Sequence, residues 1–283
     1  MVKSKHVFVN QVCTPAGDQL GLVTMEKIIA KHSTAISISV VSHAQIYLVE
    51  KLLHDIAQHC QALSLELILT LNLDEVLPFS VDTFPFPVSV IRNSIPQGFA
   101  TNHNQAFRCA TGQFFCVMNP DIRLNEDPFP ALLSCLQLSS VGVVAPVVLD
   151  EDGEMEDSAR YFPTPLKILC KAFGKCKGSD YVVKDEAIFP DWVGGMFMLF
   201  PSDIFKQLDG FDQKFFLYYE DVDLCARLRL HGYEAVVCPQ ARVIHHAQRS
   251  SHRNFGYLRW HLKSMARFFL SPVYWRLQYR KWI

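Results

Sequence analysis

Apolar and polar positions follow a repeating order from residue 35 to residue 148. At 35–42 they alternate, as they do in a β-strand with one buried face. At 47–59 apolar residues recur three and four positions apart, which predicts an amphipathic helix. Further strands are expected at 65–71, 88–91, 113–118 and 141–148, and further helices at 98–110 and 128–138. Strands that alternate with helices predict a mostly parallel, doubly wound sheet with helices on both faces.

The second half of the chain is less regular. Residues 150–185 lose the periodic pattern, and we expect them to form a surface excursion over the site. The pattern then predicts an apolar run at 196–200, helices at 202–208 and 220–230, and strands at 233–238 and 243–244. The remainder is expected to be helical, with a break at Pro272. We divide the chain into an N-terminal segment without an assigned role (1–34), one α/β domain (35–252) and a helical tail (253–283).

Composition supports a folded domain with a large core. Of the 283 residues, 49% are hydrophobic and 19% are charged, which argues against a disordered chain. The net charge of −1 argues against a dedicated nucleic-acid-binding protein. No Asp or Glu follows Glu234, whereas Lys and Arg alternate with aromatic residues in 253–283. This basic tail either lies on an anionic membrane surface, near a lipid-linked acceptor, or packs as a helix on the domain.

Cysteine usage and hydropathy indicate a cellular compartment. The nine cysteines lack CxxC spacing, and several lie in apolar runs, which is typical of free buried thiols in a reducing compartment. Residues 1–10 lack the apolar core of a signal peptide, and no run of about eighteen apolar residues is present. We therefore expect a cytoplasmic protein, peripheral on the inner face of the cell membrane if the tail binds lipid.

A short polar segment, Asn119-Pro120-Asp121, follows an apolar strand. Parallel sheets bind ligands at the carboxyl ends of their strands. A carboxylate at this place can bind Mg²⁺ or Mn²⁺, and the cation neutralises a diphosphate. The alternative is an aspartate in an ordinary turn. His245 follows the last predicted strand, where it either completes the metal site or serves as a structural residue.

Aromatic residues and carboxylates meet at 215–230, FFLYYEDVDLCARLRL. Glu220, Asp221 and Asp223 occupy the first turn of a predicted helix, where acids also complement the helix dipole. The dipole does not explain the aromatic residues that precede them. A carboxylate shielded by aromatic rings has a raised pKa and can serve as a general base.

Two further segments suit a nucleotide sugar. Trp192-Val193-Gly194-Gly195 offers an aromatic face beside exposed backbone, although a turn packed in the core would use the same residues. Residues 98–104 open a helix, and a helix N-terminus can hold phosphate. They carry no GxGxxG or Walker motif, so this segment alone does not distinguish a phosphate site from an ordinary helix start.

Five segments occur in a fixed order: VVSH, NSIPQGFATNHNQAF, MNPDI, WVGG, and GGMFMLFPSDIFKQLDGFDQKFFLYYEDVDLCARLRLHGYEAVVCPQARVIHH. In that order, between Ile36 and Ser251, they resemble the inverting GT-A-fold glycosyltransferases of family 2, particularly the rhamnosyltransferase-like branch. The resemblance implies a GT-A nucleotide-sugar-binding fold and a nucleoside-diphosphate sugar as donor, dTDP-rhamnose or a UDP-sugar. It implies a growing, lipid-linked polysaccharide of the cell surface as acceptor.

The same resemblance implies a role for each matching residue. Asp221 would deprotonate the acceptor hydroxyl, and Glu220 would position the acceptor. Asp121 and His245 would bind Mg²⁺ or Mn²⁺ at the diphosphate. The donor would contact Ser42, Asn72, Asn104, Asn119, Asp121 and Gly195, and the acceptor would contact Trp192 and Glu220.

Three positions depart from the family pattern. Asn119 replaces the first aspartate of the Asp-x-Asp metal motif, and a carboxamide is a weaker ligand for a hard cation. Leu71-Asn72 stands where relatives carry two acidic or amide residues, and His43 where tyrosine is common. Asn119 favours one alternative, a catalytically inactive glycan-binding protein on the same fold. A sugar nucleotidyltransferase is the other alternative, but it predicts a Gly- and Lys-rich phosphate loop that the sequence lacks.

Overall fold

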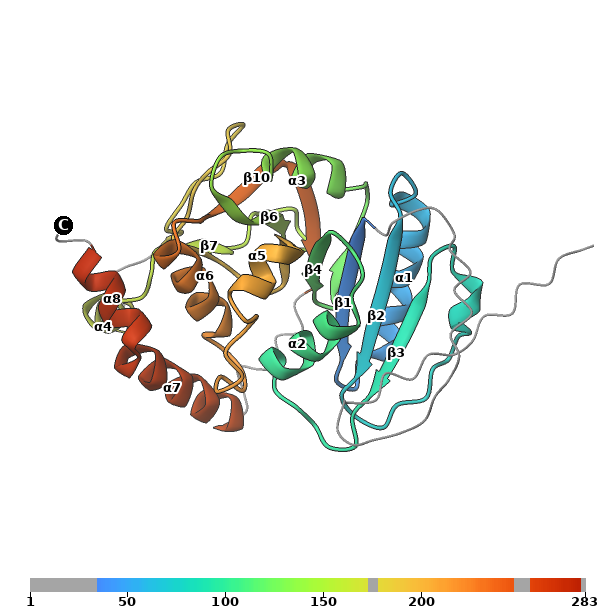
Figure 1. Ribbon diagram of the computed structural model, residues 1–283, viewed down its shortest axis with the longest axis horizontal. Helices are drawn as coiled ribbons and strands as arrows, with labels where there is room; N and C mark the ends of the chain where they lie inside the picture. Colours follow the sequence, from blue (N-terminus) through green and yellow to red (C-terminus); the bar gives the residue numbers. More distant parts are fainter. Residues whose placement is uncertain (1–34, 173–177, 247–254, 281–283) are drawn as a thin grey trace, which may run out of the picture.

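The computed structural model describes residues 35–172, 178–246 and 255–280. The N-terminal segment, 1–34, lies outside the described residues. An eight-stranded sheet forms the centre of the molecule (Figure 1). Its strands are β1 (Ile36–Ser42), β2 (Leu65–Leu71), β3 (Val88–Arg92), β4 (Phe114–Met118), β5 (Ile122–Arg123), β6 (Val141–Leu149), β9 (Phe197–Pro201) and β10 (Glu234–His245). Across the sheet they follow the order β3-β2-β1-β4-β9-β6-β10-β5.

The sheet is mostly parallel, as predicted, with two antiparallel strands. β1 pairs in parallel with β2 and β4, and β6 pairs in parallel with β10. β9 is antiparallel to both β4 and β6, between which it lies. The antiparallel direction follows from the connection, because the chain leaves β6, makes a long excursion and re-enters the sheet at the same edge.

Helices cover both faces of the sheet (Figure 1). They are α1 (Ile46–His59), α2 (Phe99–Cys109), α3 (Phe129–Cys135), α5 (Ser202–Gln207) and α6 (Glu220–Leu230). Successive side chains of a strand point to opposite faces. In β4, Cys116 therefore packs in the core with α1 and α3, whereas Phe115 packs in the core with α2, α5 and α6. Both cores are built from buried apolar side chains, whose burial supplies the main stabilisation of the fold.

Two expectations for the second half need correction. The irregular region 150–185 contains a strand and a helix, β7 (Ala159–Arg160) and α4 (Pro165–Ala172). β7 pairs with β8 (Trp192–Val193) in a separate two-stranded sheet. The strands expected at 233–238 and 243–244 form one strand, β10, whose register shifts between Cys238 and Arg242. Such a β-bulge interrupts the apolar alternation and therefore hides the continuity of a strand in the sequence.

The basic tail packs on the domain. It forms α7 (Phe255–Leu270) and α8 (Pro272–Arg280), which lie at the end of the molecule opposite β3 (Figure 1). Phe268, Tyr274 and Leu277 are buried in the same core as α6. The Ser264 hydroxyl donates a hydrogen bond of 2.8 Å to the Leu217 carbonyl and ties α7 to the loop before α6. Among the described residues, none of the helices combines the length and apolar character of a membrane span.

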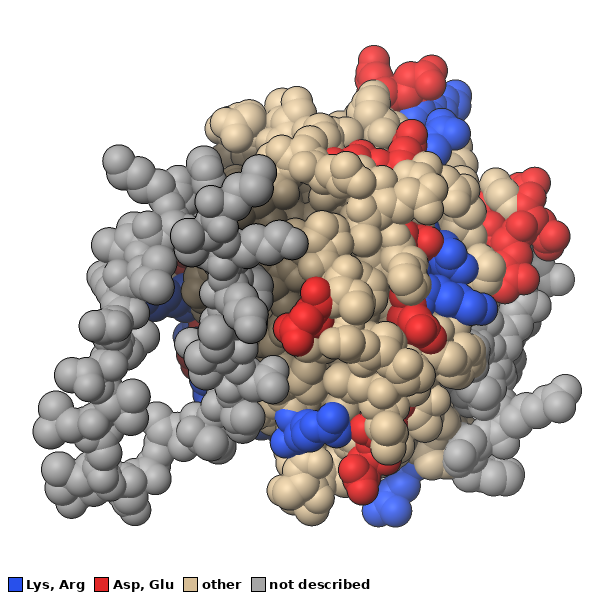
Figure 2. Space-filling model, turned by 90° about the vertical axis from the view of Figure 1, so that its right-hand side faces the viewer, with Lys and Arg blue, Asp and Glu red and all other residues tan. Residues whose placement is uncertain are grey.

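The opposite end of the molecule has a different surface. Figure 2 views the side of the β3 edge, where acidic and basic side chains lie scattered in small separate groups. On that visible face, no single sign of charge dominates, unlike the sequence of the tail. Within the described part of the chain, the cysteines form no disulfide, in agreement with the predicted free thiols.

Candidate active site

The carboxyl ends of the central strands place the first predicted residues at one edge of the sheet. Val40 of β1 is the partner of Met118 in β4, so Ser42 and Asn119 leave the sheet side by side. The Asn72 backbone N–H donates to the Ser42 carbonyl at 2.9 Å. This arrangement brings Ser42, Asn72 and Asn119 to the edge where open α/β sheets bind ligands.

Asn72 uses its entire amide within the protein. Its Nδ2 donates to the Gln97 carbonyl at 2.9 Å and lies 3.1 Å from the His43 Nδ1. Its Oδ1 accepts from the Asn93 amide at 2.9 Å and from the Gln97 N–H at 2.7 Å. Asn72 therefore shapes the loop that enters α2.

The Ser42 hydroxyl is likewise hydrogen-bonded within the protein, to a residue that the sequence analysis did not identify. Its hydroxyl donates to Glu75 at 2.9 Å, and the same carboxylate accepts from the N–H groups of Ala44 and Ile46 at 3.0 and 3.1 Å. Glu75 thereby satisfies backbone donors at the start of α1, where a helix leaves its first N–H groups unpaired. The signal is weak in the sequence because Glu75 lies far along the chain from that helix.

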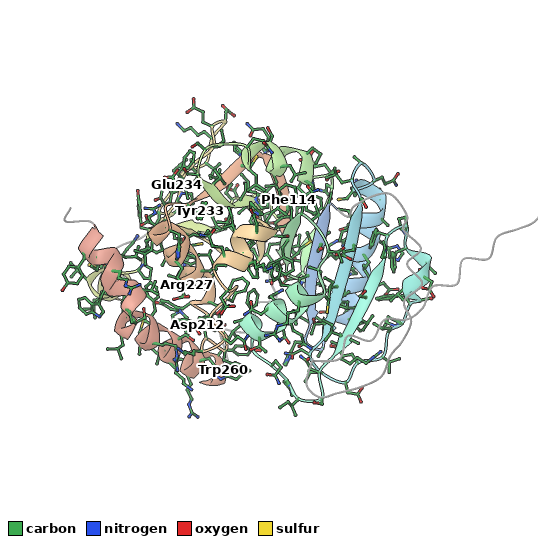
Figure 3. The ribbon with its side chains drawn as sticks, viewed as in Figure 1. Phe114, Asp212, Arg227, Tyr233, Glu234 and Trp260 are labelled. Carbon is green, nitrogen blue, oxygen red and sulfur yellow. The ribbon has the colours of Figure 1, made fainter. Side chains whose placement is uncertain are left out.

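Asn104 holds a distant turn. Its Nδ2 donates to the Phe211 carbonyl at 2.8 Å, and its Oδ1 accepts from the Phe211 N–H at 2.9 Å. Gly210 fits beside this amide with a φ of +63°, a conformation that favours glycine. Arg227 donates to the carbonyls of Leu208 and Gly210, and it lies near the loop that carries Asp212 (Figure 3). Asn104 thus fixes the turn that leads to α6 through both atoms of its amide.

Asp121 and His245 meet at the end of β10. The two residues stand on adjacent antiparallel segments, because His245 pairs with Ile122 in β5. Asp121 is buried, and its Oδ1 has no hydrogen-bond partner. The His245 Nε2 faces that oxygen at 3.4 Å, which is longer than an ordinary hydrogen bond. The other ring nitrogen, Nδ1, lies 2.8 Å from Glu156.

The residues fit a divalent cation. A buried carboxylate oxygen without a donor and a ring nitrogen converge on one place, and a carboxylate fixes the far side of the imidazole. Burial opposes protonation of His245, but Asp121 and Glu156 together raise its pKa to about 9. The ring therefore carries a proton when no cation is bound, and a cation would replace that proton. Among the described residues, no cluster of three or more acidic, His or Cys side chains forms a metal cage, so phosphate oxygens would supply further ligands.

Two residues with a strained backbone precede the acidic residues at the start of α6. Tyr218 and Tyr219 both have a φ of +68°, in the left-handed region that non-glycine residues rarely adopt. Glu220 and Asp221 follow directly as the first residues of the helix. Strain of this kind is retained where the surrounding packing determines the backbone, and here Tyr219 packs against Phe268 of α7 with ring centroids 5.7 Å apart.

Asp221 points to the turn that precedes β9. Its Oδ2 accepts a hydrogen bond of 3.1 Å from the Gly195 N–H. The next residue, Met196, accepts a hydrogen bond of 2.9 Å at its carbonyl from the Asn119 N–H. One short segment therefore connects the predicted base to the strand end that carries Asp121.

The environment favours the protonated form of both acids. Burial raises the pKa of Asp221, although backbone N–H groups of Val222 and Gly195 oppose the rise. Burial and the neighbouring Asp221 raise the pKa of Glu220 well above its ordinary value. Glu220 is only 5% exposed and its Oε2 has no partner, whereas Asp221 keeps part of its surface open. A carboxylate with a raised pKa and open surface has the properties of a general base.

Trp192 is accompanied by a cation that sequence reasoning missed. The Trp192 Nε1 donates to the Tyr161 carbonyl at 3.1 Å, and the Arg160 guanidinium lies 5.7 Å from the centre of the indole ring. Arg160 also forms an ion pair of 3.0 Å with Asp157. The pairing of β7 with β8 brings Arg160 opposite Trp192. The acidic run 150–157 was the only signal in the sequence, and its partners became visible only in the fold.

Comparison with known proteins identifies the family. Residues 36–267 match the family model described as glycosyltransferase like family 2. The chain is 30% identical over 184 residues to the rhamnosyltransferase WbbL of Escherichia coli, covering 60% of this chain and 69% of that protein. It is 30% identical over 148 residues to an N-acetylglucosaminyl-diphospho-decaprenol L-rhamnosyltransferase of Mycobacterium tuberculosis, covering 49% of this chain and 48% of that protein. The chain thus spans about half the length of the second relative.

Solved structures agree on the fold. The structure of GalNAc-T7 with UDP, GalNAc and Mn²⁺ superposes with a TM-score of 0.63 at 16% identity, covering 84% of this chain and 48% of that one. The mannosyltransferase PcManGT of Pyrobaculum calidifontis, in complex with GDP-Man and Mn²⁺, gives a TM-score of 0.57 at 18% identity, covering 84% and 65%. These likenesses establish the GT-A fold, and the family match over 36–267 establishes that the chain belongs to glycosyltransferase family 2.

Proposed function

We propose that this family-2 glycosyltransferase transfers a sugar with inversion from a nucleoside-diphosphate sugar to a hydroxyl of a glycan acceptor. One observation carries the proposal. Gly195 binds the Asp221 carboxylate, while Met196 binds the backbone of Asn119, two residues before Asp121. The base and the cation-binding carboxylate therefore lie at the same edge of the sheet. An in-line displacement requires both groups at one site, one for the attacking hydroxyl and one for the leaving diphosphate.

Residues on one side of the transferred sugar would act on the leaving diphosphate, and residues on the other side act on the acceptor hydroxyl. Asp121 and His245 would hold Mg²⁺ or Mn²⁺, which supplies electrostatic stabilisation of the leaving diphosphate. Asp221 accepts the proton of the acceptor hydroxyl, and that oxygen attacks the anomeric carbon from the face opposite the diphosphate. Burial and the neighbouring Asp221 favour the protonated form of Glu220, and this form places no second negative charge beside Asp221. Gly195 and Trp192 border the sugars, with the Gly195 N–H orienting the base.

Residues at the donor edge act mainly by shaping it. Ser42 and Asn72 keep the loops after β1 and β2 in place, and Asn104 fixes the turn before α6. Their side chains are bonded within the protein, so the backbone groups and loop surfaces that they position would contact the nucleotide. Asn119 contributes its backbone N–H to Met196 and lies next to the cation-binding residue.

The donor and acceptor are proposed from the relatives. Two relatives at 30% identity are named rhamnosyltransferases, which supports L-rhamnose carried by dTDP. One of them is named for an acceptor linked through a diphosphate to decaprenol, which supports a lipid-linked glycan. Peripheral contact with the membrane would follow from such an acceptor. Leu258 and Leu262 support it, because these apolar side chains lie one helical turn apart on α7 and are 55% and 49% exposed.

A panel of nucleotide sugars incubated with Mn²⁺ tests the function. A transferase slowly releases the nucleoside diphosphate from its proper donor, and chelation of the metal suppresses the release. The anomeric configuration of the transferred sugar, read by NMR, must be opposite to that of the donor. Release of pyrophosphate from a nucleoside triphosphate would indicate a nucleotidyltransferase instead. Binding of a glycan without turnover of any donor would indicate an inactive binding protein.

Vesicles of phosphatidylglycerol test the membrane contact. We expect the full chain to co-sediment with them and the Leu258→Gln/Leu262→Gln variant to remain in the supernatant. Both leucines are exposed, so their replacement leaves the buried side of α7 intact. Equal sedimentation of the two proteins would contradict the membrane contact but not the sugar transfer.

A further inference from the structure

A small basic pocket lies between α7 and the loop 212–219 that leads into α6. Its volume is about 150 Å³. It is lined by Lys214, Phe216, Trp260, Lys263, Ser264 and Arg267. Figure 3 shows Trp260 of α7 beside the loop that carries Asp212. Its lining includes none of the residues proposed to bind the donor, the acceptor or the cation or to act as the base.

The pocket concentrates positive charge without an internal counter-charge. Its lining contains Lys214, Lys263 and Arg267 but neither Asp nor Glu. Within the described residues, none of these three cations forms an ion pair. Asp223, which is electrostatically near Lys214, is already bound by Arg227 at 2.7 Å. Positive charges gathered in a concave site repel one another and attract anions, so the pocket favours binding of a multiply charged anion.

The walls of the pocket are held in place by packing. The rings of Phe216 and Trp260 lie 4.9 Å apart at 37°, and Tyr257 packs edge-on against Trp260 at 5.4 Å. Ser264 donates its hydroxyl to the Leu217 carbonyl and so binds the helix to the loop. The helix α7 and the loop 212–219 are thus held together, and both contribute cations to the pocket.

The pocket is linked to the predicted base through two residues, Phe99 and Gly195. The Phe216 carbonyl accepts a hydrogen bond of 2.9 Å from the Phe99 N–H. The Phe99 ring in turn lies against Gly195, the residue that binds Asp221. Contacts through Phe99 and Gly195 therefore connect the pocket to the base, whereas Asp121 and His245 stand at the other end of the Gly195–Met196 segment.

We propose that this pocket binds a phosphate or diphosphate ester group of the acceptor. The inference rests on the proposed transferase function and adds the acceptor's anionic group to it. Three cations match the multiple charge of a phosphate ester, whereas one carboxylate would need only one of them. Lysines bind phosphate as point charges and arginine can bind two of its oxygens. No bond is made or broken here, because the pocket only positions the acceptor.

The experiment compares two soluble acceptors that differ only in a phosphate ester at the reducing end. In Lys263→Gln and in Arg267→Gln, the KM for the phosphorylated acceptor should rise about tenfold or more, as expected for a lost charge-assisted hydrogen bond. The KM for the unphosphorylated acceptor and the rate of donor hydrolysis should not change. Arg259→Gln, an exposed cation on the same helix outside the pocket, is the matched control and should leave every constant unchanged.

Lys214→Gln repeats the test from the opposite wall and guards against a folding defect of α7. Unaltered thermal unfolding and unaltered donor hydrolysis would show that each variant is folded. Equal KM changes for both acceptors, or an equal effect of Arg259→Gln, would overturn the proposal. If the pocket variants lose binding to phosphatidylglycerol vesicles while the KM for the phosphorylated acceptor is unchanged, the phosphate belongs to a membrane headgroup and the proposal is also overturned.

Direct binding separates this proposal from the proposed function. Calorimetry with inorganic pyrophosphate, without donor or metal, should show binding to the wild-type chain and to Arg259→Gln but about tenfold weaker binding to Lys263→Gln. Such binding supports the pocket even if no sugar transfer is found. Active transfer together with identical pyrophosphate binding by all variants would reject the pocket and leave the transferase intact.

Discussion

The donor edge and the acidic end of the site differ in the hydrogen bonding of their polar side chains. At the donor edge, Ser42, Asn72 and Asn104 find hydrogen-bond partners within the protein. At the acidic end, oxygens of Asp121, Asp157 and Glu220 are buried without a hydrogen-bond partner. Among the described residues, the only other buried side-chain atom of this kind is the Thr70 hydroxyl. Asp121 and Glu220, two of these residues, are among those proposed to act in the chemistry.

This difference distinguishes positioning residues from reactive ones. A buried carboxylate without a donor destabilises the folded state, because burial penalises its charge. Such a group persists where a ligand, a cation or a proton completes it. At the donor edge the described atom of this kind is the uncharged Thr70 hydroxyl, not a carboxylate, and this edge serves as scaffold. The comparison predicts that substitutions at the acidic end will affect turnover, whereas substitutions at the donor edge will affect mainly stability.

Asp221→Asn should have the largest effect. Removing the base should lower the transfer rate by about 10²–10⁴, while the donor still binds with nearly its original affinity. The transfer rate at saturating substrates and the donor Kd, measured on the same preparation, separate the two effects. Full turnover in this variant would remove Asp221 from the role of base.

Asp121→Asn should weaken metal-dependent turnover. The amide cannot replace the charge that the carboxylate brings to the cation, and the loss should reach several kcal/mol of transition-state stabilisation. Turnover as a function of Mn²⁺ concentration should show a higher metal requirement and a lower maximum. An unchanged metal titration curve would place the cation elsewhere.

Glu156→Gln should have an intermediate effect. Glu156 lies 2.8 Å from the His245 Nδ1 and orients the ring, so its loss should reduce Mn²⁺ affinity by about 10- to 100-fold. Glu154→Gln is the matched control, because Glu154 is an exposed carboxylate of the same loop. Mn²⁺ binding followed by paramagnetic resonance gives the affinities, and equal values for the two variants would contradict the orienting role.

Asn104→Ala should affect stability more than catalysis. The substitution leaves the N–H and the carbonyl of Phe211 without their partner, at a loss of about 1–3 kcal/mol in the free energy of unfolding. Chemical denaturation measures the loss, with Asn125→Ala, at an exposed amide, as control. A large rise in the donor KM without any loss of stability would show that Asn104 contacts the donor instead.

Glu220→Gln should raise stability slightly at neutral pH. Because the folded-state pKa of Glu220 is raised, the folded protein binds more protons than the unfolded chain above the ordinary carboxyl pKa. The free energy of unfolding of the wild type therefore falls as pH rises through that window. The variant has no carboxyl at this position and does not show the fall, so it should be more stable at neutral pH by on the order of 1 kcal/mol. Thermal unfolding of both proteins across pH should show the difference shrinking toward acidic pH. A difference that grows toward acidic pH would contradict the sign.

Much of the fold followed from the sequence, because periodicity reports burial. The strands at 36–42, 65–71 and 114–118 and the helix at 220–230 occur within a residue or so of their predicted positions. The antiparallel direction of β9 could not be predicted, since apolar runs carry no direction. The two short strands β7 and β8 contain two residues each, too few for any period.

The sequence indicates candidate site residues but not the residues that contact them. Asp121, His245 and Asp221 are candidates from the sequence because strand ends, helix starts and a family resemblance mark them. Glu75, Glu156 and Arg160 were missed, because each acts through a contact with a residue at least 29 positions away or through a pairing of short strands. Such contacts depend on tertiary packing and leave no local pattern.

The most direct test is a structure of the Asp221→Asn variant with an intact nucleotide sugar and Mn²⁺. The account predicts Mn²⁺ in contact with Asp121, His245 and the diphosphate, and the anomeric carbon between the diphosphate and the side chain at position 221. An anomeric carbon that faces away from position 221, with Mn²⁺ bound by other residues, would contradict it.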